Sequence, residues 1–169
     1  MKELIEGRRF GFAPRPQLAP LAAGLGIAVT LLDLMAWFGW GARDTNGFVI
    51  AASWIATATA VVALLATLAA FVESTDAAED DRALARLDLL AAFVAFLLYA
   101  VSSAFRVGDQ GAAAASPAAL LAALSGLIVL LVDGVIAATL YASRDWQVLD
   151  DDDYDPRRHA RPPLHSRSR

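Results

Sequence analysis

Four long apolar runs, separated by short polar segments, occupy most of the chain. They lie at about residues 20–41, 48–72, 84–105 and 117–142. Each run has the roughly 20 residues that an α-helix needs to cross a hydrocarbon core of about 30 Å. The pattern therefore predicts an all-α integral membrane protein, a four-helix bundle that runs up-down-up-down.

Little sequence remains outside these runs. Residues 1–17 form a basic lead-in, and prolines as far as Pro20 are expected to keep it irregular until the first helix begins. The four-helix domain is expected to occupy residues 18–146. Residues 147–169 combine a block of aspartates with an Arg-, Pro- and Ser-rich end, a composition that predicts a largely disordered tail.

The distribution of Lys and Arg predicts the orientation. With four spans, both termini lie on one side of the membrane. Arg43 and Arg106 are the two basic residues on the other side, which leaves 12 of the 14 on the side of the termini. Because basic loops stay in the cytoplasm, both termini are predicted to be cytoplasmic.

Composition excludes several kinds of chemistry. The chain has 169 residues, 57% of them hydrophobic, and no cysteine, so disulfides, iron–sulfur clusters and thiolate metal sites are excluded. The histidines, His159 and His165, both lie in the C-terminal tail, so no span offers the axial histidine that a membrane haem typically uses. We expect no cofactor bound by this chain alone, although lipid or pigments held by a partner are compatible with it.

Motifs for an enzymatic reaction are also missing. No nucleophile elbow, zinc-protease or phosphate-binding loop pattern occurs, and we expect no enzyme. The net charge of −4 resides in loops and tails, and it gives no indication of a nucleic-acid partner.

Three acids fall inside the apolar runs, namely Asp33, Asp88 and Asp133. A charge within the bilayer costs several kcal/mol unless it is paired or hydrated. Asp33 is expected to pair with Arg106, since both belong to the outer half. Asp88 can meet Arg86 only poorly, because residues two apart on a helix point in different directions, so its carboxylate is expected to reach interfacial water.

Two interpretations of these acids are open. In one, Asp33 and Asp133 are stations on a path for protons or cations. In the other, each acid accepts hydrogen bonds from a neighbouring helix and fixes the register of the bundle.

Polar and small residues are arranged in stripes at helical spacing. On the first run, Asp33 shares a stripe with Gly26, Thr30, Trp37 and Trp40. The third run carries a polar, small-residue face made of Asp88, Ala92, Ala95, Tyr99, Ser102 and Arg106.

The second and fourth runs carry small residues that let helix backbones approach closely in lipid. The second has an alanine stripe that includes Ala56 and Ala60, and the fourth has Gly126 and Gly134. These faces predict packing within the bundle, or alternatively a surface for another subunit.

The segment before the first run reads Arg15-Pro16-Gln17-Leu18-Ala19-Pro20. Together with an acid late in helix 1 (Asp33), an arginine closing helix 3 (Arg106) and a Leu-, Ser- and Gly-rich segment at 120–147, it resembles the bacterial membrane family called domain of unknown function 2231. That family tends to begin with a histidine where this chain has Arg15, and a second family histidine is replaced by Leu84 or a neighbour. The resemblance implies a four-helix protein of the bacterial inner membrane, and any haem or metal held by those histidines would be lost here.

These observations predict a non-enzymatic accessory or structural subunit of a larger membrane assembly of respiratory or photosynthetic type. Its expected partners are membrane lipids and other membrane subunits, or further copies of itself. The alternative is a proton or ion transporter or channel that uses Asp33 and Asp133.

Overall fold

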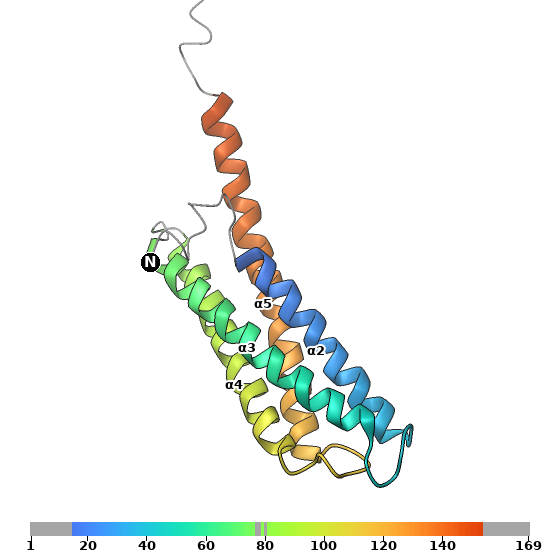
Figure 1. Cartoon of the computed structure of the whole chain (residues 1–169). Helices are drawn as coiled ribbons and strands as arrows, with labels where there is room; N and C mark the ends of the chain where they lie inside the picture. The colour runs from blue at the N-terminus through green and yellow to red at the C-terminus, as the bar shows by residue number, and fades with distance from the viewer. Residues whose placement is uncertain (1–14, 77–78, 80, 154–169) are drawn as a thin grey trace, which may run out of the picture.

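The structure, a computed structural model, describes residues 15–76, 79 and 81–153, with the backbone alone for residues 76 and 141–153. Helices are the regular elements of the described part (Figure 1): α2 (Arg15–Trp37), α3 (Gly47–Asp76), α4 (Arg82–Arg106) and α5 (Pro117–Asp153). Each of the four contains a segment long and apolar enough to cross a membrane. The predicted all-helical class and the four spans are therefore confirmed for the described residues, and they indicate a multi-pass membrane protein.

The helices form an elongated bundle in which each helix has two neighbours. Helix α2 packs against α3 and α5, and α4 also packs against α3 and α5. Helices α2 and α4 therefore face each other across the bundle. Helix α5 extends well past the ends of the others (Figure 1).

Helix α2 begins earlier than the sequence suggested. It begins at Arg15, so the expectation of an irregular chain as far as Pro20 is wrong. Proline is tolerated in the first turn of a helix, because the N–H groups there have no helical partner in any case. Pro16 occupies that turn, and Pro20 follows one turn later.

Helix α2 also ends earlier, at Trp37 rather than at residue 41. The Gly39 backbone has φ +81°, a left-handed conformation that favours glycine. The Trp40 N–H donates to the Met35 carbonyl and the Gly39 N–H donates to the Ala36 carbonyl, both at 3.0 Å. These two bonds form the Schellman motif that closes many helices.

Helix α5 continues to Asp153. Residues 147–153, which were expected to be disordered, are therefore helical. The rest of the predicted tail, residues 154–169, lies outside the described residues, as do residues 1–14 of the predicted lead-in.

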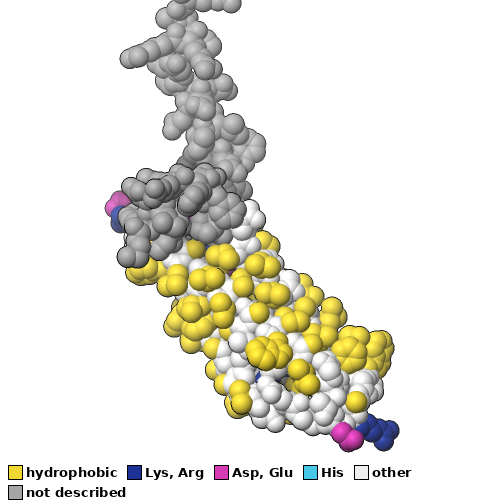
Figure 2. Space-filling view, in the orientation of Figure 1, with side chains coloured by type: hydrophobic (Ala, Val, Ile, Leu, Met, Phe, Trp, Pro, Cys, Tyr) yellow, Lys and Arg dark blue, Asp and Glu magenta, His cyan; other side chains and the backbone are white. Residues whose placement is uncertain are grey.

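The interior consists mainly of alanine. The predicted polar face of α4 is buried over its whole length, and so is the alanine stripe of α3 that includes Ala56 and Ala60. The predicted stripe of α2 is only partly correct, since Gly26 and Asp33 are buried whereas Trp37 and Trp40 are exposed. Large hydrophobic side chains lie outside instead, along the length of the visible face (Figure 2), as a lipid-facing surface requires.

Candidate functional site: two buried charge clusters

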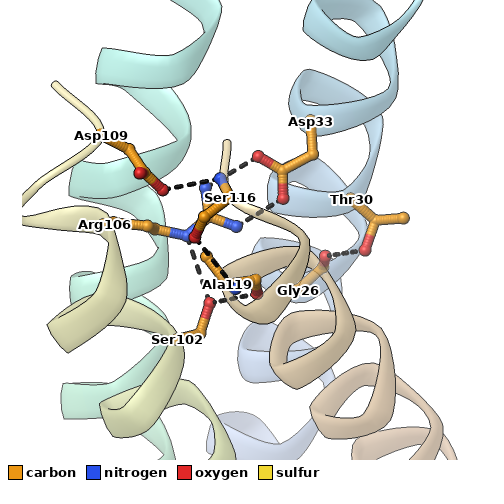
Figure 3. Close-up of polar contacts among 8 residues, drawn as sticks. All are labelled: Gly26, Thr30, Asp33, Ser102, Arg106, Asp109, Ser116 and Ala119. Carbon is orange, nitrogen blue, oxygen red and sulfur yellow. Dashed lines mark hydrogen bonds and ion pairs between the residues drawn. The ribbon is translucent and has the colours of Figure 1, made fainter. Parts of the chain in front are cut away.

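The first charge cluster joins α2 to the end of α4, and we call it the Arg106 cluster (Figure 3). The Arg106 guanidinium donates through Nη1 to Asp33 Oδ1 at 2.7 Å and through Nη2 to Asp33 Oδ2. Its Nε donates to Ser102 Oγ at 3.2 Å. A planar guanidinium that grips both oxygens of one carboxylate is the strongest geometry for such a pair. The pair expected between Asp33 and Arg106 therefore forms.

The Arg106 cluster also reaches α5. Ser102 Oγ donates to the Ala119 carbonyl at 2.8 Å, so a single hydroxyl links the arginine of α4 to the first turn of the next helix. Close by, the Ser116 N–H donates to Asp109 Oδ2 at 2.8 Å (Figure 3). Asp33, Ser102 and Arg106 are all buried, and together they tie three helices at one end of the bundle.

The second charge cluster lies at the opposite end of α2, and we call it the Arg15 cluster. Arg15 donates through Nε to Asp88 Oδ2 at 3.0 Å and through Nη2 to Asp88 Oδ1 at 2.7 Å. The same Nη2 donates to Asp133 Oδ1 at 2.6 Å. All three residues are at most 2% exposed. The expectation that Asp88 reaches interfacial water is therefore wrong, because a buried arginine of α2 occupies its carboxylate.

Arg15 was not predicted to belong to a charge cluster, because residues 1–17 were assigned to the lead-in before the first helix. A signal was present, however. Arg15 precedes Asp33 by five full turns of helix at about 3.6 residues per turn, so the two residues share one face of a helix that begins early enough. Asp88 and Arg106 have the same separation on α4.

Tyr99 lies between the two clusters. Its ring fills space left by two glycines: a Cβ at Gly26 would collide with the Tyr99 hydroxyl, and one at Gly126 would come within 2.8 Å of Tyr99 Cε2. Gly26 and Gly126 therefore pack against the same aromatic side chain, that of Tyr99. The Tyr99 hydroxyl is buried without a hydrogen-bond partner among the described residues.

Gly134 differs from the other two predicted packing glycines. A Cβ there would have no atom within 4 Å, so Gly134 does not support close packing within the bundle. Instead it lines a groove of about 360 Å³ between α2 and α5. Small residues of both helices dominate its lining, which comprises Pro16, Ala19, Pro20, Ala23, Leu130, Leu131, Gly134, Ala137 and Ala138.

An apolar core separates the two clusters. Its buried members come from all four helices: Ala22, Val29, Ala56, Ala60, Ala95, Tyr99, Ala123 and Leu130. The distance from Arg15 to Asp33 along α2 is about 27 Å at 1.5 Å per residue, nearly the thickness of a hydrocarbon core. Each cluster therefore lies near one end of the span, with apolar side chains in between.

A third polar centre, at Asn46, escaped the sequence reading. This residue is 2% exposed, and its Nδ2 donates to the carbonyls of Trp40 at 2.7 Å and Ala113 at 2.8 Å. Its Oδ1 accepts from the Phe48 N–H at 3.0 Å, as an asparagine that caps a helix does. One side chain thus caps α3 and joins the two connections at this end. The Asn-Gly pair before the second run was the available signal.

Two of these centres are held by ion pairs, and the third is held by hydrogen bonds of a neutral amide. Within the described part of the chain, no group of three or more His, Cys, Asp or Glu side chains is placed to hold a metal ion. The acids that sequence reasoning considered for a conduction path each lie against an arginine. Comparison of the chain with protein-family models, with curated proteins and with solved structures finds no match.

Proposed function

We propose that this protein is a non-enzymatic accessory subunit of a larger membrane assembly, in which it serves as a rigid four-helix scaffold. The observation that carries the proposal is the contrast between the inside and one outer face of the bundle. Inside, charged side chains tie helices together. Outside, the α2–α5 groove is lined by small residues that no part of the described chain fills.

The occupant that fits this groove best is a transmembrane helix of another subunit. In lipid, helices associate through close van der Waals contact of small residues rather than through burial of apolar area. Gly134 and Ala138 offer such a surface on α5 and Ala23 offers it on α2, while Ala19 and Ala137 line the groove from buried positions. A helix seated there would gain contacts that lipid chains make less well.

The proposed orientation is up-down-up-down with both termini in the cytoplasm of a bacterial cell, the protein residing in the inner membrane. Arg15 and Arg106 are buried in ion pairs and do not count as loop charges. Arg43 is then the one basic residue in the connections 38–46 and 107–116. The count of 12 against 2 becomes 11 against 1, so the ratio of basic residues between the two sides rises, which supports cytoplasmic termini.

The alternative function, a proton or ion path through Asp33 and Asp133, has weaker support. These acids belong to different clusters, with the alanine-rich core between them. An ion that moves from one to the other needs polar groups or water along the way. The buried residues between them are mainly apolar, and the buried hydroxyl of Thr59 donates to the Ile55 carbonyl of its own helix. A flux in proteoliposomes that Asp33→Asn abolishes without loss of fold would reverse this preference.

The test of the accessory role is purification from native membranes in a mild detergent, with mass spectrometry and an absorption spectrum of the isolated particle. We expect stoichiometric partner subunits, and a pigmented partner would indicate a respiratory or photosynthetic assembly. Recovery of the chain as a lone monomer, or with copies of itself alone, would contradict the proposal.

A pair of matched variants localises the contact. Gly134→Leu fills the groove and is expected to leave the bundle folded while the partner is lost. Gly24→Leu places the same side chain on an open part of α2 outside the groove, and it should retain the partner. Equal retention by both variants would exclude the α2–α5 groove as the contact.

A further inference from the structure

We propose that the Arg15 cluster is a proton-binding site, which holds one exchangeable proton on the carboxyl group of Asp133, next to Asp88. This inference is independent of the accessory role, because it rests on the charges and contacts of three buried side chains.

The first argument is a count of charges. The Arg106 cluster contains one guanidinium and one carboxylate, so it is neutral. The Arg15 cluster contains one guanidinium and two carboxylates, and with both acids ionised it would carry one uncompensated negative charge. An unpaired charge that is buried at membrane depth costs several kcal/mol. One proton makes the cluster neutral.

The second argument is the geometry around Arg15. Asp88 uses both of its oxygens, one on Nε and one on Nη2, which is the arrangement of an ionised carboxylate. Asp133 contacts the guanidinium through Oδ1 alone. Both acids accept from the same Nη2, so their oxygens are close neighbours. Carboxylates this close commonly share a proton. Asp133 accepts one hydrogen bond from Arg15 whereas Asp88 accepts two, so Asp133 is the group that carries the proton.

Among the described side chains, no second cation is paired with Asp88 or Asp133 in place of the proton. On α4, Arg86 is exposed and points away from Asp88, and the exposed Arg82 pairs with Glu79 at 3.3 Å. On α3, the charged residues toward this end are Glu73 and Asp76, both acids, and the side chain of Asp76 is outside the described part. On α5, the side chains beyond Leu140, including Arg144 and Asp145, are outside the described part, as is the chain before Arg15. A metal ion is disfavoured because Arg15 already places a positive charge between the two acids.

The test is infrared spectroscopy of the purified full-length protein in lipid nanodiscs at neutral pH. A protonated carboxylic acid has a C=O stretching band that an ionised carboxylate lacks. We expect one such band in the wild type, shifted in deuterium oxide because the proton exchanges, and absent in Asp133→Asn. Asp33→Asn, at the neutral cluster, should leave the band unchanged.

Asp133→Asn also tests the fold. Its amide oxygen still accepts from Arg15 and its charge matches that of the protonated acid, so the unfolding midpoint should stay close to that of the wild type. In Asp88→Asn, Asp133 can ionise and keep the cluster neutral, so the band should be absent there too, while loss of the two-oxygen contact with Arg15 should lower the midpoint. Absence of the band in the folded wild type, its persistence in Asp133→Asn, or failure of Asp133→Asn to fold would each overturn the proposal.

Discussion

Arg106 lies 73 residues after its partner Asp33, and Asp88 lies 73 residues after its partner Arg15. The two pairs thus repeat one interval with the charges exchanged, since α2 supplies the base at one end and the acid at the other. It follows that α2 and α4 run in the same direction across the bundle.

The same interval also relates the residues between the two pairs. Four buried positions of α2 correspond to four buried positions of α4 at a separation of 73: Ala19 and Ala92, Ala22 and Ala95, Gly26 and Tyr99, Val29 and Ser102. At Gly26 the absent side chain leaves room for the large Tyr99. The two clusters therefore fix how α2 and α4 are aligned along their length. A shift of α2 by one helical turn relative to α4 would separate both the Arg15–Asp88 pair and the Asp33–Arg106 pair.

Loss of one member of a buried pair should be costly. Arg106→Gln leaves the Asp33 carboxylate buried without its cation, and we expect a loss of about 3 kcal/mol in the free energy of unfolding. The measurement is a titration with a denaturing detergent, followed by helical circular dichroism. Arg82→Gln is the matched control, since its pair with Glu79 is exposed and should contribute little. Equal effects of the two variants would show that the buried pair does not stabilise the bundle.

Exchange of the charges should restore part of that loss. The double variant Asp33→Arg with Arg106→Asp gives this end the polarity that the Arg15 cluster already has, with the base on α2. We expect it to unfold at a higher denaturant concentration than either single variant. The coupling between the two sites is measured by a double-mutant cycle. A double variant no more stable than the worse single variant would mean that the position of each charge matters more than the pairing.

Gly26 should tolerate a methyl group only when Tyr99 is shortened. Gly26→Ala places a Cβ against the Tyr99 hydroxyl, and overpacking of this kind typically costs about 1–3 kcal/mol. Tyr99→Phe removes the hydroxyl, which has no hydrogen-bond partner within the described chain, so it should be neutral alone and should rescue Gly26→Ala. The unfolding midpoint in detergent reports both effects.

The control for this pair is Gly24→Ala, on the same helix, where a Cβ meets nothing within 4 Å. We expect no loss there, because a helical glycine replaced by alanine gains stability when space is available. If Gly26→Ala were as well tolerated as Gly24→Ala, close contact with Tyr99 would not constrain this position.

Asn46 should hold the two connections at its end of the bundle together. Asn46→Ala leaves three backbone groups without their side-chain partner, and we expect a cost of about 2 kcal/mol. Hydrogen exchange should become faster in residues 107–116, which contact Asn46 through Ala113. Thr45→Ala, at an exposed neighbour, should change neither quantity, and an unchanged exchange rate in Asn46→Ala would contradict the assigned role.

The sequence predicted the face of α4 because that face is periodic and polar. Asp88, Tyr99, Ser102 and Arg106 recur at spacings of three and four among small residues, and all are buried. The other faces of α4 carry large hydrophobic side chains that can face lipid, so this polar, small-residue face is the one that had to be buried. The Asp33–Arg106 pair followed because both residues had to lie at the same depth.

The face of α2 could not be fixed in the same way. Residues three and four away from Asp33 lie on either side of it, so a stripe through Thr30 and Trp37 was as consistent with the spacing as one through Val29 and Ala36. The structure buries Val29 and Ala36. Thr30 Oγ1 donates instead to the Gly26 carbonyl of its own helix. Packing against the other helices decided the choice, and the sequence of α2 alone does not contain that information.

The alanine-rich interior has a consequence for how this protein can be studied. Among the described residues, the buried hydrophobic positions are alanines with five exceptions, Val29, Val49, Tyr99, Leu130 and Leu140. Alanine scanning, which reveals most protein cores by removing volume, would therefore leave this one almost unchanged. The core has to be probed instead by replacing each buried alanine with a larger residue, one position at a time. The positions at which the larger residue destabilises the bundle will identify the surfaces where the helices are in contact.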